Sequence, residues 1–283
     1  MSDRLNLAVA GKLDDAAALL SAQGANPFRV RAYRRGASTL RRLREPVSSL
    51  LAAEGIEGLE KLPGIGTSLA RAIRDILHLG YFPMLERLRG DADPVRLLAS
   101  VPGIGPRLAA RLHKELGLDT LEHLEAAAHD GRLRDIAGFG DKRLAGVRDV
   151  LAQRLARVRQ PSQRAPGQPS VAELLDLDRE YREAAAADRL PKIAPRRFNP
   201  ERRPWLPILH ASRGHRHYSV LFSNTARAHR WGKTSDWVVL YCDHESQDGQ
   251  WTVVTSGDGP MQGRRIVRGR EDECARHYGF AAA

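Results

Sequence analysis

The chain has 283 residues, 42% of them hydrophobic and 28% charged, and no apolar run long enough to cross a membrane. This composition excludes a membrane-spanning protein and predicts two or three globular domains. The net charge of +11 favours a polyanionic partner, most often nucleic acid. Only six of the 45 basic residues are lysines, which fits bidentate binding of phosphate by arginine, although a GC-rich genome would also favour arginine codons.

The first half of the chain is predicted to be helical. Residues 5–160 contain short amphipathic segments separated by glycine-containing turns, for example the spacing of Leu69, Ile73, Ile76 and Leu77. The stretch RQPSQRAPGQPS, residues 159–170, has no apolar periodicity and is typical of a linker. The start MSDRLNLAVAGKLDD lacks a basic region followed by an apolar one, so we expect no secretory signal and a cytoplasmic protein.

The second half shows a different pattern. Residues 171–190 are helical by periodicity, whereas 217–223, 236–243 and 250–256 are β-branched and aromatic runs typical of strands. A short helix ending near Gly232 and a terminal helix complete this half. Cys242 and Cys274 lack the spacing of a disulfide framework or a zinc site. We therefore predict an all-α helix-hairpin-helix N-terminal half plus a small α+β C-terminal domain.

One pattern occurs three times in the first half. It consists of glycine, an apolar residue and glycine, followed directly by an amphipathic helix: LPGIGTSLARAIRDIL from residue 62, VPGIGPRLAARLHKEL from 101 and IAGFGDKRLAGVRDVL from 136. Glycine accepts the positive φ of a tight turn and lets a phosphate approach the main chain. The helix that follows directs unpaired N–H groups and its positive dipole end at the same phosphate. We therefore predict DNA binding through backbone contacts that do not depend on base sequence.

The predicted DNA contacts come from the three turns and the helix starts. They are Gly64, Gly66, Thr67, Gly103, Gly105, Arg107, Gly138, Gly140, Lys142 and Arg143. Ile65, Ile104 and Phe139 are expected to anchor the turns in the core. The alternative is that the turns only connect helices, and it applies most to the third copy, which lacks proline and carries Asp135 and Asp141.

These residues resemble a known family. Residues 5 to about 155 are similar to the N-terminal portion of family X DNA polymerases, the group that includes polymerase beta. The segments that carry the resemblance lie at 26–43, 61–80 and 100–143. The resemblance implies a lyase-like domain at 1–85 and a fingers-like region at 86–158. The linker at 159–170 and a basic α+β domain of unknown role at 171–283 rest on the composition and periodicity given above, and the resemblance does not extend to them.

The resemblance also implies how the hairpins bind. The first would contact the strand downstream of a gap and the second the primer side, each with a monovalent cation, K⁺ or Na⁺. The carbonyl ligands would be those of Glu60, Leu62 and Ile65 and those of Ala99, Val101 and Ile104. Arg29 and Tyr33 match part of a 5′-phosphate pocket and are added to the predicted DNA contacts.

Lyase chemistry departs from the family pattern. The lysine that forms a Schiff base in the family is matched here by Ala72, and two accompanying lysines are matched by Ser68 and Glu60. Because a Schiff base needs a neutral amine, we do not expect the usual lyase. Lys61 lies close by as a substitute amine or, alternatively, as an exposed lysine that meets a phosphate.

The polymerase palm is not recognised either. The nearest match to its D-x-D metal motif is Asp176 and Asp178, which fall in a helical pattern where residues two apart point to different faces. We interpret both as solvated helix residues and expect no polymerase activity.

The second half leaves two alternatives open. Residues 192–233 hold ten basic side chains against one acid, interleaved with Phe198, Trp205, Tyr218, Phe222 and Trp231. This pattern suits single-stranded nucleic acid, and it equally suits aromatic core residues with an arginine rim. Histidines at 210, 215, 217, 229 and 244, with Asp236 and Asp243, raise a nuclease alternative in which His217 is the candidate catalytic residue.

We therefore predict a sequence-independent DNA-binding protein that recognises gapped, nicked or end-containing DNA in repair. No cofactor is expected beyond K⁺ or Na⁺ at the hairpins, no membrane partner is expected, and we expect the protein at the nucleoid. The alternatives are a lyase that uses Lys61, a metal-dependent nuclease that uses the C-terminal histidines, and an RNA-binding protein.

Overall fold

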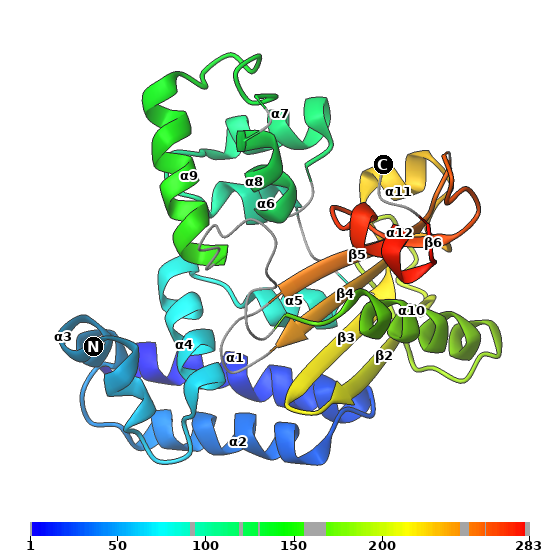
Figure 1. The fold of residues 1–283 in the computed structure, drawn as a ribbon. Helices are drawn as coiled ribbons and strands as arrows, with labels where there is room; N and C mark the ends of the chain where they lie inside the picture. Colours follow the sequence, from blue (N-terminus) through cyan, green and yellow to red (C-terminus); the bar gives the residue numbers. More distant parts are fainter. Residues whose placement is uncertain are drawn as a thin grey trace. The chain divides into compact units, whose positions relative to one another are not determined.

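The computed structural model describes residues 2–90, 94–118, 121–129, 131–155, 168–243, 249–257 and 259–280 (Figure 1). It confirms the predicted fold class, a helical half followed by a small α+β domain. Two compact units are present. Unit 1 comprises Met1–Asp91, Val171–Phe222 and Val238–Ala283, and unit 2 comprises Ala92–Ser170 and Ser223–Trp237. Most of the predicted linker lies outside the described residues, which resume at 168.

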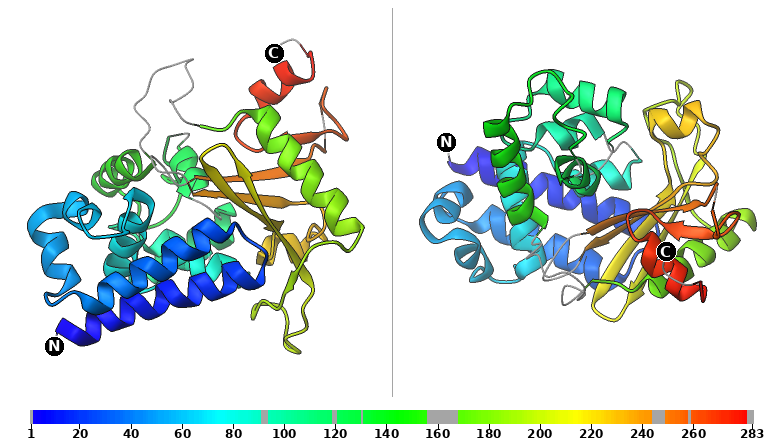
Figure 2. Two further views of the ribbon diagram at one scale, coloured as in Figure 1. Left: turned by 90° about the horizontal axis from the view of Figure 1, so that it is seen from below. Right: turned by 45° about the horizontal axis from the view of Figure 1, so that its top comes forward.

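Unit 1 begins with helices. They are α1 (Ser2–Ala22), α2 (Pro27–Arg42), α3 (Val47–Glu60), α4 (Thr67–Leu79) and α5 (Pro83–Leu88). Helix α2 begins where the Asn26 side chain accepts a hydrogen bond from the Phe28 N–H at 2.9 Å, with Pro27 in the first turn. Helix α4 ends at Gly80 in the left-handed conformation. Figure 2 shows α1 and α2 lying side by side.

The second part of unit 1 is a six-stranded antiparallel sheet in the order of the sequence. Its strands are β1 (Lys192–Ile193), β2 (Leu206–Arg213), β3 (Arg216–Phe222), β4 (Val238–Asp243), β5 (Gly249–Thr255) and β6 (Arg265–Val267). The strands predicted at 217–223, 236–243 and 250–256 correspond to β3, β4 and β5. Strand β2 was not predicted, because LPILHASR combines a proline with polar residues and lacks strict alternation.

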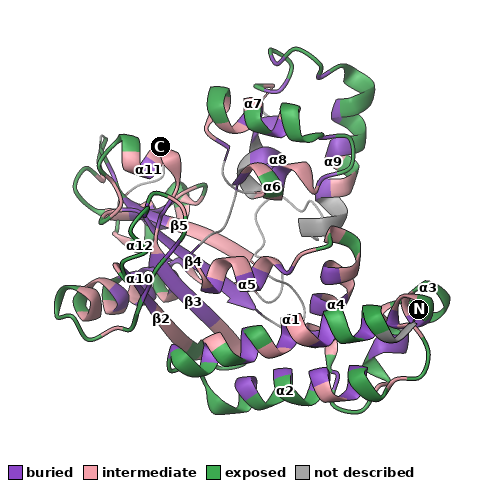
Figure 3. Ribbon diagram, turned by 180° about the vertical axis from the view of Figure 1, so that it is seen from behind, coloured by how far each residue is buried: buried purple, intermediate pink, exposed green. Residues whose placement is uncertain are grey.

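Helix α10 (Val171–Ala186) packs on the sheet. Helix α12 (Glu271–His277) packs against α10 and β6. The sheet also shares an apolar core with the N-terminal helices, in which Val239 and Tyr241 join Leu13 and Leu88. Strands β3 and β4 are accordingly buried along most of their length (Figure 3). The sheet is thus covered by helices that are far apart in sequence.

The two aspartates of α10 do not share a site. Asp176 pairs with Arg179 and with Arg213, the latter at 3.2 Å, and is half-buried. Asp178 was predicted to be solvated, and that prediction is wrong: it is fully buried and accepts hydrogen bonds from Arg265 at 2.7 and 3.0 Å. Burial of the carboxylate is tolerated because it is paired.

Unit 2 is helical. Its helices are α6 (Pro94–Ala99), α7 (Pro106–Leu116), α8 (Leu121–His129), α9 (Asp141–Leu155) and α11 (Ala226–Arg230). Segment 223–237, which follows β3 in the chain, belongs to this unit because Arg227 donates to the Gly117 carbonyl at 3.4 Å while lying over the Trp231 ring. No helix in the described ranges of either unit has the length and apolar character needed to span a membrane.

Candidate nucleic-acid interface

The three glycine turns are closed by the same backbone hydrogen bond. The N–H of the apolar residue between the glycines donates to the carbonyl three residues earlier: Ile65 to Leu62 at 3.1 Å, Ile104 to Val101 at 2.9 Å and Phe139 to Ile136 at 3.0 Å. The following helix starts identically too, since Gly66, Gly105 and Gly140 each accept from the N–H four residues on, at 2.9 to 3.0 Å. The third copy, without proline, therefore folds like the first two.

The first glycine of each turn has a backbone conformation that other residues rarely adopt. Its φ is +76° at Gly64, +88° at Gly103 and +97° at Gly138. A β-carbon at Gly64 would lie 2.4 Å from Cδ of Arg35, whose side chain crosses this turn. Glycine is needed here for the turn itself.

The second glycine of each turn has a different role. Gly66 and Gly105 have φ of −91° and −77°, a region open to any residue, so the turn does not require glycine there. All three second glycines are exposed, and a β-carbon at Gly66, Gly105 or Gly140 would meet nothing within 4 Å. The absence of a side chain keeps the main chain accessible at the point where the helix N–H groups begin.

The apolar residues between the glycines are buried, as expected. Ile65 is 3% exposed and belongs to the core of unit 1, whereas Ile104 and Phe139 belong to one core in unit 2. Each turn is thus fixed to a core on one side while its glycines stay exposed. This arrangement presents the main chain of a preorganised turn.

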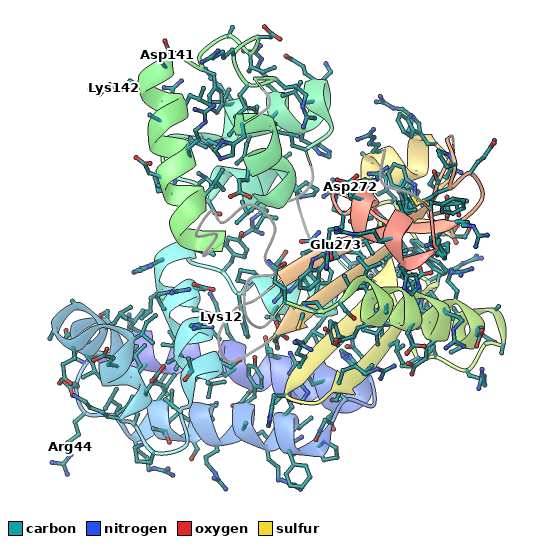
Figure 4. The ribbon with its side chains drawn as sticks, in the orientation of Figure 1. Lys12, Arg44, Asp141, Lys142, Asp272 and Glu273 are labelled. Carbon is teal, nitrogen blue, oxygen red and sulfur yellow. The ribbon has the colours of Figure 1, made fainter. Side chains whose placement is uncertain are left out.

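Charged side chains flank the turns of unit 2. Arg107 is exposed in the first turn of α7, and Asp141 and Lys142 lie at the start of α9 (Figure 4). Arg143 donates to the carbonyl of Gly138, and its Cγ lies 3.9 Å from the position of a β-carbon on Gly103. One arginine therefore lies close to two of the turns. Thr67 is half-buried in the first turn of α4.

Of the predicted cation ligands, Leu62, Ile65, Val101 and Ile104 lie in the first two turns, and Glu60 and Ala99 are the last residues of α3 and α6. The Leu62 and Val101 carbonyls accept the turn-closing hydrogen bonds, and a carbonyl oxygen has a second lone pair that such a bond leaves available. Neutral carbonyl oxygens suit a monovalent cation. The residues present therefore fit K⁺ or Na⁺, whose binding stays a prediction.

Arg29 and Tyr33 are buried residues of α2. Arg29 is 8% exposed and pairs with Asp243 of β4, which Arg87 also contacts at 3.3 Å. The Tyr33 hydroxyl lies 3.2 Å from the sulfur of Met84. Burial by itself raises the pKa of Asp243, but the two guanidinium groups outweigh burial and hold the pKa below its usual value. A DNA end would reach Arg29 only after this ion pair opened, so their contact with DNA stays a prediction.

The candidate lyase residues are also located. Ala72 is buried in the core of unit 1. Lys61 is exposed and donates to Glu54 at 2.8 Å, and this hydrogen bond, with the charge of the carboxylate, raises the pKa of the ammonium group. A raised pKa keeps the amine protonated, which opposes Schiff-base formation.

The C-terminal histidines do not gather at one site, although His210 and His217 both lie near enough to Asp243 for its charge to act on them. His217 faces Asp243 across the β3–β4 pair, whereas His229 contacts Asn224 at 2.7 Å in unit 2 and His244 lies outside the described residues. Nowhere in the described part of the chain do three or more His, Cys, Asp or Glu residues form a group that could hold a metal. Cys242 and Cys274 are buried and form no disulfide bond.

His210 takes part in a polar contact between the sheet and α1. Its Nε2 lies 2.8 Å from Oε1 of Gln23, and its Nδ1 lies 3.1 Å from the Ser219 hydroxyl. Burial, with the charge of Arg29, lowers the pKa of His210 to about 4. The imidazole is therefore neutral at pH 7 and serves the packing of unit 1.

Comparison with known proteins defines the class of the first half. A family model described as a helix-hairpin-helix domain matches residues 4–82, and one described as a SAM-like helix-hairpin-helix tandem matches residues 95–154. These ranges contain the first turn and the second and third turns, respectively. The first half of the chain is thus a helix-hairpin-helix region, and DNA binding is the function that this region supports.

A similar protein of known name shows which kind of helix-hairpin-helix region this is. The chain is 30% identical over 131 residues to the DNA polymerase/3'-5' exonuclease PolX of Bacillus subtilis (strain 168). The match covers 46% of this chain and 22% of the relative, so it spans about a fifth of the relative's length. The predicted resemblance is confirmed: the N-terminal half is similar to the helix-hairpin-helix region of PolX-like proteins.

Proposed function

We propose that the protein holds DNA that contains a gap, a nick or an end, as part of repair, through contacts to the phosphate backbone that do not depend on base sequence. The observation that carries this proposal is the threefold repetition of one turn geometry, with an exposed glycine and open space at the start of each helix. Main-chain N–H groups bind phosphates but do not distinguish bases. K⁺ or Na⁺ at the first two turns, and a location at the nucleoid, form part of the proposal.

A gap or nick is favoured over intact duplex because turns in two compact units can hold the two flanks of an interruption separately. The net charge of +11 supports binding that weakens as salt rises, since phosphate contacts release counterions. The similarity to PolX, a DNA polymerase by name, supports a substrate of this kind.

The test is the affinity for intact, nicked, gapped and single-stranded DNA at one salt concentration, measured for the wild type, Gly66→Val and Gly105→Val. The φ of both positions is open to any residue and a β-carbon there meets nothing within 4 Å, so we expect valine to leave the fold intact while its side chain excludes the phosphate. We expect each variant to lose about 10- to 100-fold in affinity for gapped DNA, because charge-assisted hydrogen bonds are lost.

Gly146→Val is the matched control. Gly146 lies within α9 and belongs to none of the three turns; it is exposed and has nothing within 4 Å of a β-carbon. Wild-type affinity in Gly66→Val and Gly105→Val would contradict the proposal, as would equal loss in Gly146→Val. Stronger binding of RNA than of gapped DNA would favour the RNA-binding alternative.

A further inference from the structure

The loop between β1 and β2, residues 194–205, displays an aromatic ring among arginines. Phe198 is 48% exposed. The loop carries four arginines against one acid, a net charge of +3 within twelve residues; these are Arg196, Arg197, Arg202, Arg203 and Glu201. The guanidinium of Arg197 lies 5.5 Å from the centre of the Phe198 ring. An exposed ring among guanidinium groups offers a stacking face beside positive charge, the combination that binds single-stranded nucleic acid.

The loop is held in one conformation. The buried side chain of Asn199 accepts a hydrogen bond from the Arg203 N–H at 3.1 Å and donates to the Arg203 carbonyl at 2.9 Å. The Arg202 N–H donates to the Asn199 carbonyl at 3.0 Å, and at the base of the loop the Trp205 N–H donates to Ile193 at 3.1 Å. The tip that carries Phe198 is therefore preorganised.

Two residues of the loop have a strained backbone. Phe198 has φ of +55° and Arg202 has φ of +50°, the left-handed region in which a β-carbon is unfavourable. Glycine would adopt either conformation without strain. Strain that the surrounding structure enforces is characteristic of functional positions. The positive φ of Phe198 and Arg202 therefore marks the loop as a candidate functional segment.

We infer that the 194–205 loop is a second DNA site, at which Phe198 stacks on an unpaired base and the arginines neutralise the flanking phosphates. Stacking on an aromatic ring beside basic groups is how proteins bind single strands without sequence preference. The inference rests on the proposed function, because a gap, a nick or an end supplies the unpaired base while the hairpins hold the backbone. A protein partner is less favoured, since the loop combines high positive charge with a single exposed ring.

The experiment compares Phe198→Ala, Phe198→Tyr and Phe28→Ala in the full chain, with a single-stranded deoxythymidine 20-mer, gapped duplex and intact duplex. Phe28 is the matched control because it is 75% exposed and lies 4.4 Å from the guanidinium of Arg31. We expect Phe198→Ala to weaken binding of the 20-mer and the gapped duplex by about 5- to 150-fold, as expected for the loss of one stacked base. Phe198→Tyr and Phe28→Ala should bind like the wild type, and intact duplex should be unaffected.

Phe198→Gly excludes misfolding as the cause. It removes the ring and relieves the strained φ, so we expect the melting temperature to rise by about 2 to 4 °C while affinity for the 20-mer falls as in Phe198→Ala. Unchanged binding of the 20-mer in Phe198→Ala overturns the inference, as does an equal loss in Phe28→Ala. Loop-dependent capture of an acidic peptide, with binding of the 20-mer unaffected by Phe198→Ala, overturns it as well.

Failure of the proposed function looks different. In that case the wild type binds none of the DNA substrates, or the glycine-to-valine variants of the hairpins bind like the wild type. Failure of the loop site alone leaves hairpin-dependent binding of gapped duplex intact and leaves Phe198→Ala without effect.

Discussion

The hairpins and the 194–205 loop both contain residues with positive φ. In the hairpins these residues are glycines, whereas in the loop they have large side chains. The hairpins place glycine there, at Gly64, Gly103 and Gly138. The loop places Phe198 and Arg202 there. Where the main chain is to meet a ligand, removal of the side chain is useful and the turn is unstrained. Where a side chain is to be displayed, the residue is kept and the strain is tolerated.

Acid should weaken unit 1, which carries both the 194–205 loop and the first hairpin. The loop belongs to unit 1, where His210 has a pKa of about 4 in the fold against about 6.5 when unfolded. Because the unfolded chain binds the proton more readily, this contribution to stability is complete above about pH 6.5 and is lost as the pH falls towards 4. We expect unit 1 to lose about 3 kcal/mol of unfolding free energy between pH 7 and pH 4.

Urea denaturation at a series of pH values measures this loss, with His210→Gln as the comparison, since glutamine does not titrate. The pKa of His217 is also lowered, chiefly by burial, and leaves a smaller dependence of the same sign in the variant. An identical pH profile in the wild type and in His210→Gln would show that His210 does not control the acid sensitivity of unit 1.

The two glycines of one hairpin should respond differently to alanine. Gly64→Ala places a β-carbon at positive φ and against Arg35, so we expect a loss of about 1 to 2 kcal/mol of unfolding free energy. Gly66→Ala should lower the unfolding free energy by only about 0.5 kcal/mol, because the conformation is permitted and the space is open, and alanine is merely a poorer N-cap than glycine. Thermal denaturation of both variants measures the difference. Equal losses would mean that the division of roles between the two glycines is wrong.

Relief of strain in the loop should give the smallest effect. Arg202→Gly removes the unfavourable β-carbon at φ of +50°, and we expect a gain of about 1 kcal/mol in unfolding free energy. The same variant should lose a few-fold in affinity for the deoxythymidine 20-mer, because one cation is removed. Arg203→Gly is the control for charge, since Arg203 does not have positive φ. If Arg203→Gly raised the unfolding free energy as much as Arg202→Gly does, relief of backbone strain at Arg202 could not explain the gain.

The hairpins could be predicted from the sequence because each is a local structure. The glycines, the apolar anchor and the following helix lie within about one helical turn of each other, and the bonds that close the turn join residues three or four apart. The threefold repetition made the prediction of DNA binding stronger, since one such turn alone is weak evidence. The helices and the strands β3, β4 and β5 were predicted for the same reason, because periodicity is a local signal.

The sequence by itself thus determined the helix-hairpin-helix region, the basic charge and the α+β character of the second half. Only the tertiary structure decided what covers Arg29, because its partner Asp243 is 214 residues away, and His210 meets Gln23 across 187 residues. The same holds for the assignment of segment 223–237 to unit 2 and for the strained φ of Phe198. Such contacts depend on which surfaces pack together, and that packing is set by the burial of apolar area over the whole chain. Contacts between residues far apart in the chain produce no local periodicity in the sequence, so they could not be predicted from it.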